Sequence, residues 1–169
     1  MMEDSQQETL RLLAESVAAF ARPDAARSRA ARDAHQGCDP AVWNEMAGLG
    51  WCGVLVPEEQ GGLGLDLAAA CTIARGLGRG GHHEPYVACA VVAASVLAAC
   101  GASMEVNGLI DGTRRLTLAW QPDDGGWEVA DSTVRVHAAG PVAELDGNCR
   151  FVVDPAAAAF LVAARAGDE

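Results

Sequence analysis

Lysine is absent from this sequence of 169 residues, and aromatic residues make up only 5% of it. The twelve basic residues are therefore all arginines, against 23 acidic residues, which gives a formal net charge of −11. The sequence shows no basic cluster, and an acidic chain of this kind argues against nucleic acid and anionic membranes as partners. Half of the residues are hydrophobic, which is enough for a buried core.

Cysteine pairs with the C-x-x-C spacing are also absent. The six cysteines are Cys38, Cys52, Cys71, Cys89, Cys100 and Cys149. Because several lie in apolar helical patterns, we expect reduced, buried thiols and no metal site. The first residues, MMEDSQQE, are acidic and polar and do not resemble a signal peptide. These features together predict a cytoplasmic protein.

Residues 86–104 form a stretch of 19 positions without any charged residue, which is close to the length of a membrane span. The stretch is dominated by alanine and contains only one leucine. Pro85 suits a first helical turn, and Gly101 suits a helix end. The composition therefore favours a buried helix of about four turns over a membrane span.

Apolar residues recur at helical spacing in five segments of the first two thirds of the chain. These segments are residues 5–22, 40–49, 67–77, 84–100 and 103–110. Residues 24–37 show only weak periodicity, so they form either an exposed helix or a loosely ordered connection. The first part of the chain is therefore predicted to be all helical.

The period of the apolar residues changes after residue 113. Short alternating or apolar runs predict strands at residues 116–120, 133–137, 150–153 and 160–163, with glycine-containing turns between them. The predicted fold class is α+β, with an all-α domain at residues 1–113 and an incomplete antiparallel β domain at residues 114–169. Four short strands leave open edges unless a partner or further sequence covers them.

Three patterns in the sequence suggest chemistry, but each has a simpler interpretation. Residues 76–81 spell G-x-G-x-x-G, yet they close a helix and do not follow a strand, as a dinucleotide site requires. His82 and His83 are adjacent and have no third ligand at metal spacing, which favours a solvated loop. The pairs Glu58-Glu59 and Asp123-Asp124 lie in polar turns, where solvated carboxylates are usual. None of these residues names a reaction.

The most specific sequence motif lies at residues 43–66, WNEMAGLGWCGVLVPEEQGGLGLD. This stretch resembles the N-terminal domain of the acyl-CoA dehydrogenase family, which carries a pattern close to W…LGW-x-G-x-x-VPEE-x-GGLG. The resemblance continues at residues 74–79 and 109–112 and covers nearly the whole chain. We expect the apolar run at residues 51–56 to lie between the helical and the β part.

The resemblance implies a flavoenzyme. In this family an acyl-CoA loses a proton to a catalytic glutamate and a hydride to FAD. The flavin lies between a middle β domain and a C-terminal helical domain and contacts a neighbouring subunit, so dimers or tetramers are usual. The glutamate comes from the C-terminal domain, and we expect this chain to end before that domain begins. No catalytic residue is therefore assigned.

The resemblance also implies positions for the flavin and substrate contacts. By family position, the cofactor-binding residues are Trp120, Gln121, Pro122, Phe151, Val152 and Val153, and the substrate-binding residue is Gly126. The two motifs, L-T-E-P-x-x-G-S-D and K-x-W-I-T-N, are altered here, because Trp120 and Val153 replace residues whose hydroxyl groups contact the flavin. Each buried polar group left without a partner costs about 1–3 kcal/mol. We therefore expect that the chain alone does not hold FAD.

Two functions follow from these observations. In the first, the chain belongs to an FAD-dependent enzyme of lipid metabolism that dehydrogenates an acyl-CoA at Cα and Cβ. The chain is then a truncated or non-catalytic subunit, inactive alone, that works in a homo- or hetero-oligomer with an acyl-CoA dehydrogenase-type partner. In the second, the chain is a non-enzymatic helical interaction module or a relic fragment.

Overall fold

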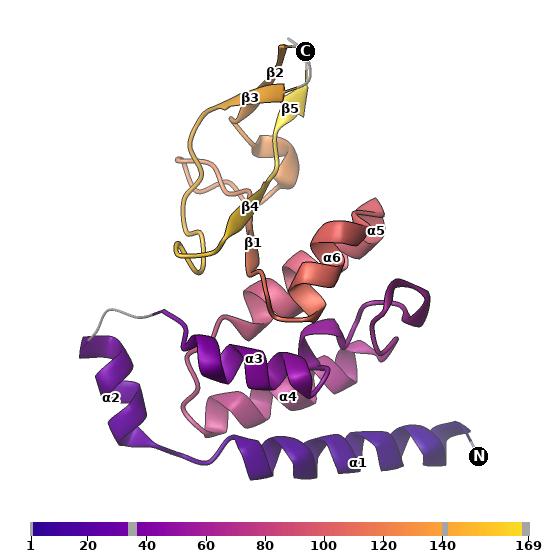
Figure 1. Cartoon of the computed structure of the whole chain (residues 1–169). Coiled ribbons are helices and arrows are strands. Elements are labelled where there is room, and N and C mark those ends of the chain that lie inside the picture. Colours follow the sequence, from indigo (N-terminus) through magenta and orange to yellow (C-terminus); the bar gives the residue numbers. More distant parts are fainter. Residues whose placement is uncertain (1, 34–36, 140–141, 167–169) are drawn as a thin grey trace.

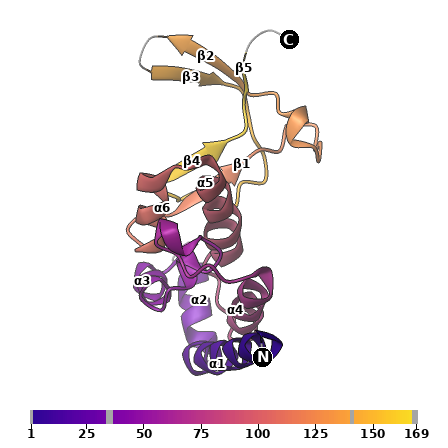
Figure 2. The ribbon, with the colours of Figure 1, turned by 90° about the vertical axis from the view of Figure 1, so that its right-hand side faces the viewer.

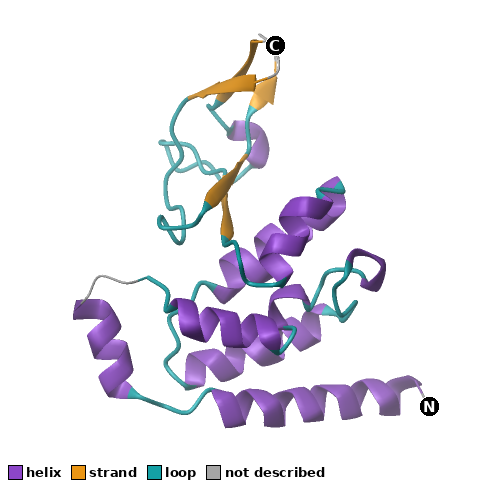
Figure 3. Ribbon diagram, in the orientation of Figure 1, coloured by secondary structure: helices purple, strands orange, loops and turns teal. Residues whose placement is uncertain are grey.

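The computed structural model describes residues 2–33, 37–139 and 142–166, and it places helices first and strands last along the chain (Figures 1 and 3). The α-helices are Met2–Phe20 (α1), Ala25–Asp33 (α2), Pro40–Gly48 (α3), Leu67–Arg79 (α4), Ala94–Cys100 (α5) and Ser103–Ile110 (α6). Short 3-10 turns lie at Trp51–Gly53 (η1), Glu58–Gln60 (η2) and Val129–Asp131 (η4). The predicted α+β fold class is confirmed.

Helices α3 and α4 begin where the sequence predicts. The Asp39 carboxylate accepts a hydrogen bond from the backbone N–H of Ala41 at 2.9 Å, with Pro40 as the first helical residue. In the same way, the Asp66 carboxylate accepts from the backbone N–H of Ala69 at 3.0 Å. Local side chains therefore fix both helix starts.

Helix α1 packs against α4, and the closest approaches are at Gly76 and Gly80. A Cβ added at Gly76 would lie 2.2 Å from Cγ1 of Val17, and one at Gly80 would lie 2.3 Å from the carbonyl oxygen of Ala21. Helix α4 ends at Arg79, so the interpretation of the pattern as a helix end is confirmed. The glycines let two backbones approach closely.

The apolar run that follows α3 lies within the helical part. Its segment η1 contacts α3, α6 and the helical segment η3, described below. Trp51 is 1% exposed, and its ring meets the ring of Phe20 edge-on at 5.0 Å between centroids. The prediction that this run lies between the helical and the β part is wrong for η1, because Trp51 fills the core beneath α1.

The uncharged segment at residues 86–104 contains one helix that begins with π-helical turns and continues as an α-helix. Residues Val87–Ala93 (η3) are a π-helix that continues directly into α5, which ends at Gly101 in the left-handed conformation. The expected buried helix is confirmed, but its first turns are wider than an α-helix. Within residues 2–33, 37–139 and 142–166, no helix is long and apolar enough to cross a membrane.

The strands form two small sheets at one end of the helical part. The strands are Leu116–Ala119 (β1), Arg135–Ala139 (β2), Val142–Asp146 (β3), Ala159–Val162 (β4) and Arg165–Ala166 (β5). β1 and β4 pair in parallel, while β2 pairs antiparallel with β3 and in parallel with β5. The prediction of an antiparallel β domain is therefore wrong for two of these three strand pairs. β1 packs on η3, and β2 and β3 lie farther from the helices (Figure 2).

One predicted strand is absent from the described residues, and two observed strands were not predicted. Residues 150–153 form no strand; only an isolated bridge joins Arg150 to Gln121. The apolar run there is interrupted because Phe151 adopts a φ of 54°, in the left-handed region. The missed strands are β3 and the two-residue strand β5. The turn predicted at residues 140–141 lies outside the described residues.

Candidate functional site

A cavity of about 520 Å³ lies where the helical part meets β1. We call it the junction cavity. It is lined by Ala74, Leu77, Gly78, His82, His83, Glu84, Pro85, Tyr86, Val87, Ala88, Val92, Thr117, Leu118, Trp120, Gln121, Phe151 and Val153. The lining therefore comes from α4, the segment after it, η3, β1 and the segment at residues 151–153. Its volume lies within the range of roughly 300–1,000 Å³ typical of small-molecule sites.

The structure places most of the residues with a family-assigned role around this cavity. Four of the six cofactor-position residues line it, namely Trp120, Gln121, Phe151 and Val153. Val152 instead lines a second, apolar cavity of about 310 Å³ within the strand part. Their roles remain predictions.

The other two residues with a family-assigned role lie together just after β1. Pro122 is fully buried. A Cβ added at Gly126 would lie 3.1 Å from Cγ of Pro122 and 3.0 Å from a carboxylate oxygen of Asp131. Neither residue lines the junction cavity.

Among the residues that the structure describes, the lining of the junction cavity is mostly apolar and carries no arginine. Val87 and Val92 of η3 are exposed on one side, and Phe151 is exposed on the other. Glu84 is the one carboxylate in the lining, and the Trp120 ring lies 6.4 Å from the ring of Trp127. A cavity without a cation suits a neutral apolar group and offers nothing to balance a phosphate.

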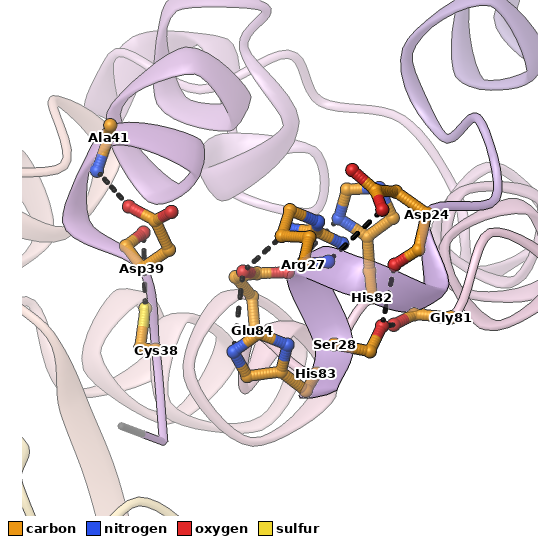
Figure 4. A network of polar contacts seen from close by, with 10 residues as sticks. All are labelled: Asp24, Arg27, Ser28, Cys38, Asp39, Ala41, Gly81, His82, His83 and Glu84. Carbon is orange, nitrogen blue, oxygen red and sulfur yellow. Dashed lines mark hydrogen bonds and ion pairs between the residues drawn. The ribbon is translucent and has the colours of Figure 1, made fainter. Parts of the chain in front are cut away.

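The lining includes a buried carboxylate, that of Glu84, which lies in a network of polar contacts (Figure 4). The Glu84 side chain is 0% exposed, and its Oε1 lies 3.3 Å from Nη1 of Arg27. Its Oε2 lies 3.0 Å from Nδ1 of His82, whose ring stacks on Phe20 at 5.1 Å. In addition, the hydroxyl of Ser28 donates to the carbonyl of Gly81. These contacts tie α2 to the segment at residues 81–84.

The expectation of a solvated loop at His82 and His83 is therefore wrong for the segment. Burial lowers the pKa of His82, and the positive charge of Arg27 lowers it further, while the hydrogen bond to Glu84 acts in the opposite direction. Arg27 lies 57 residues from Glu84 along the chain, so no local pattern reveals the pairing. The carboxylate pairs Glu58-Glu59 and Asp123-Asp124 are exposed, as predicted.

The polar side chains that line the junction cavity differ from those of the family's flavin motifs. The positions of Trp120 and Val153 offer no side-chain hydroxyl, whereas Thr117, Gln121 and Tyr86 bring other polar groups to the lining. The Tyr86 hydroxyl is buried without a hydrogen-bond partner among the described residues. The cavity therefore offers apolar contact for a ring together with some polar groups, but not the two hydroxyl groups of the family motifs.

The cysteines give no metal centre among the described residues, where no group of three or more His, Cys, Asp or Glu could hold an ion. Cys38, Cys52 and Cys89 are buried free thiols, as predicted, whereas Cys71 and Cys100 are exposed. Burial raises the pKa of Cys38 to about 11 and that of Cys52 to about 12. These buried thiols are poor nucleophiles near neutral pH.

Comparison with known families gives one match. The sequence pattern described as "Acyl-CoA dehydrogenase, N-terminal domain" matches residues 7–107. No curated protein matches the chain.

Solved structures similar to the chain are acyl-CoA dehydrogenase-like proteins. A variant of the Tcur3481–Tcur3483 steroid ACAD is 28% identical, with a TM-score of 0.71 over 99% of this chain and 46% of that chain. The ChsE4–ChsE5 complex from Mycobacterium tuberculosis is 26% identical, with a TM-score of 0.74 over 95% and 44%. An acyl-CoA dehydrogenase complexed with FAD from Bacillus anthracis is 20% identical, with a TM-score of 0.77 over 94% and 29%. The chain thus spans less than half the length of each of these structures.

Proposed function

The chain belongs to the acyl-CoA dehydrogenase family, and we propose that it takes part in FAD-dependent α,β-dehydrogenation of an acyl-CoA as a subunit that needs a partner. Its helical domain, residues 1–113, and its partial middle domain, residues 114–169, together supply one side of the ligand site. In this proposal the partner supplies the catalytic base and the remaining flavin contacts. The polypeptide alone is inactive.

The junction cavity is the observation that carries this proposal. It brings four residues at family cofactor positions against the apolar face of η3. Because the lining holds no arginine, the cavity suits the neutral acyl group or a flat ring, and the phosphates of CoA or FAD must lie elsewhere. A part-site of this kind explains how a family member with altered flavin motifs can still contribute to the reaction.

The proposed acyl group is bulky, and the proposed assembly is a hetero-oligomer. Of the two relatives described above that are more than 25% identical, one is named a steroid ACAD and the other is a complex of two named chains. These names support a polycyclic acyl group and a second type of subunit. A straight-chain acyl-CoA is the alternative substrate, and turnover with each kind of thioester distinguishes the two.

The test uses cofactor colour. Three samples are purified: the chain alone, the chain together with an acyl-CoA dehydrogenase-like partner encoded nearby, and the partner alone. We expect no flavin absorbance from the chain alone, and flavin absorbance with substrate-dependent bleaching from the pair. Yellow, active protein from the chain alone would overturn the need for a partner. Equal activity of the partner alone would remove this chain from the reaction.

The alternative is a non-enzymatic interaction module. The apolar residues exposed on the strand part favour it, since Val142, Leu145 and Phe160 are all exposed and suit a protein partner. A stable complex that gains neither colour nor turnover would support this alternative.

A further inference from the structure

The chain segment at residues 151–154, which brings Phe151 and Val153 to the junction cavity, has an unusual backbone conformation. Phe151 has a φ of 54° and Asp154 a φ of 57°, and among the described residues these are the non-glycine residues with positive φ. Residues with a Cβ avoid this region, and they hold it only where their surroundings enforce it. The two strained residues bracket the part of the chain that closes the cavity.

A buried ion pair holds this segment against the start of β1. The Asp154 side chain is 1% exposed, and its Oδ2 accepts a hydrogen bond from Nε of Arg115 at 2.8 Å. Nη2 of Arg115 also donates to the carbonyl of Ala156 at 3.2 Å. The backbone N–H of Ala158 donates to the carbonyl of Arg115 at 2.9 Å. Arg115 therefore contacts the segment at three points just after its strained residues.

The same segment contains a second ion pair that serves as a natural control. Nε of Arg150 lies 2.8 Å from a carboxylate oxygen of Asp123, the same distance as in the buried pair. Both of these side chains are more than half exposed, however, at 58% and 53%. Exposed pairs contribute little, whereas removing one partner of a buried pair leaves an uncompensated charge.

We propose that the Arg115–Asp154 pair is a positioning device that holds residues 151–153 as one side of the junction cavity and thereby sets its affinity for an apolar ligand. The ligand part of this inference rests on the proposed function. Neither residue lines the cavity, so both act through Phe151 and Val153. The predicted loss of affinity follows from movement of that segment and not from a lost contact to ligand.

The first readout is the exposure of Trp120, which lines the cavity. In a Trp127→Phe background, acrylamide quenching reports mainly on Trp120, because Trp43 and Trp51 are each 1% exposed. We expect Arg115→Met and Asp154→Asn to increase this quenching, and Arg150→Met and Asp123→Asn to leave it unchanged. Asparagine keeps the size of aspartate and tolerates positive φ, so Asp154→Asn retains the fold. Arg115→Lys keeps the charge but loses the planar guanidinium that donates two hydrogen bonds. Its quenching of Trp120 should therefore lie between those of the parent and Arg115→Met.

The second readout is binding of Nile red, a neutral polycyclic fluorophore. The variant Ala88→Trp, which fills the cavity, measures the background binding of the dye outside the cavity. We expect Arg115→Met and Asp154→Asn to weaken binding by about tenfold, and the two exposed-pair variants to bind like the parent. Equal effects of the buried and exposed pairs on quenching, with folding verified by circular dichroism, would overturn the positioning role. If the parent chain binds no Nile red above background, the apolar-ligand site fails, and quenching alone still decides the positioning role.

Discussion

The helical part and the strand part of this molecule bury their apolar residues to very different degrees. The helical part has a continuous core that runs from Val17 on α1 to Leu109 on α6 and includes two fully buried tryptophans. The strand part leaves every residue of β3 exposed and leaves Phe160 of β4 half exposed. The buried apolar core of the chain therefore lies mainly in the helical part, while the strand part leaves large apolar side chains exposed.

The largest expected effect is the loss of stability in Trp51→Ala, compared with the loss in Phe160→Ala. Removing a fully buried aromatic side chain should cost about 3–5 kcal/mol in the free energy of unfolding. Phe160 is 45% exposed, so its removal should cost less than half as much. Urea denaturation of both variants measures the difference. Equal losses would mean that the strand part has as firm a core as the helical part.

A second test concerns the close approach of α1 and α4. Gly76→Ala places a methyl group 2.2 Å from Cγ1 of Val17, so overpacking should destabilise the chain by about 1–3 kcal/mol. Gly78 lies on the same helix but has nothing within 4 Å of an added Cβ. Gly78→Ala should therefore stabilise by up to about 1 kcal/mol through helix propensity alone. Thermal unfolding of the two variants gives the sign of each effect, and the same sign for both would refute the packing role.

The third prediction concerns pH and the segment between α4 and η3. His82 has a folded-state pKa below its unfolded value of 6.5, mainly because of burial, so the unfolded chain binds the extra proton. The contribution of His82 to stability is fully present above about pH 6.5 and is lost as pH falls from there through the folded pKa. Unfolding followed from pH 7.5 downward should show this loss, and His82→Gln should flatten the curve in that window.

Local chemistry in the sequence determines the parts of the fold that were predicted. Asp39 and Asp66 start their helices through bonds to residues two or three positions away, so these boundaries can be read from the sequence. The strand at β1 follows from its apolar composition in the same way.

The parts of the fold that were predicted wrongly depend on residues far away in the sequence. The segment at residues 150–153 has a strand-like composition, but its left-handed backbone is tied to Arg115, which lies 39 residues from Asp154. His82 and Glu84 are buried because Arg27 and Phe20, on α2 and α1, cover them. The π geometry of η3 likewise has no local signature in an alanine-rich run. The resemblance to the family predicts the cofactor positions, and four of the residues at these positions line one cavity.

The smallest expected effect on stability comes from the exposed apolar residues of β3. Leu145 is 51% exposed and Val142 is 69% exposed, so replacing both with threonine should change the free energy of unfolding by less than about 0.5 kcal/mol. The same replacement should reduce association, because β3 is an edge strand whose apolar side chains suit another chain. Sedimentation velocity of the parent and the double variant measures this, with Glu144→Gln as a control on the same strand. Unchanged association together with a large loss of stability would reverse the comparison, since β3 would then belong to the core of this chain and not to a surface for a partner.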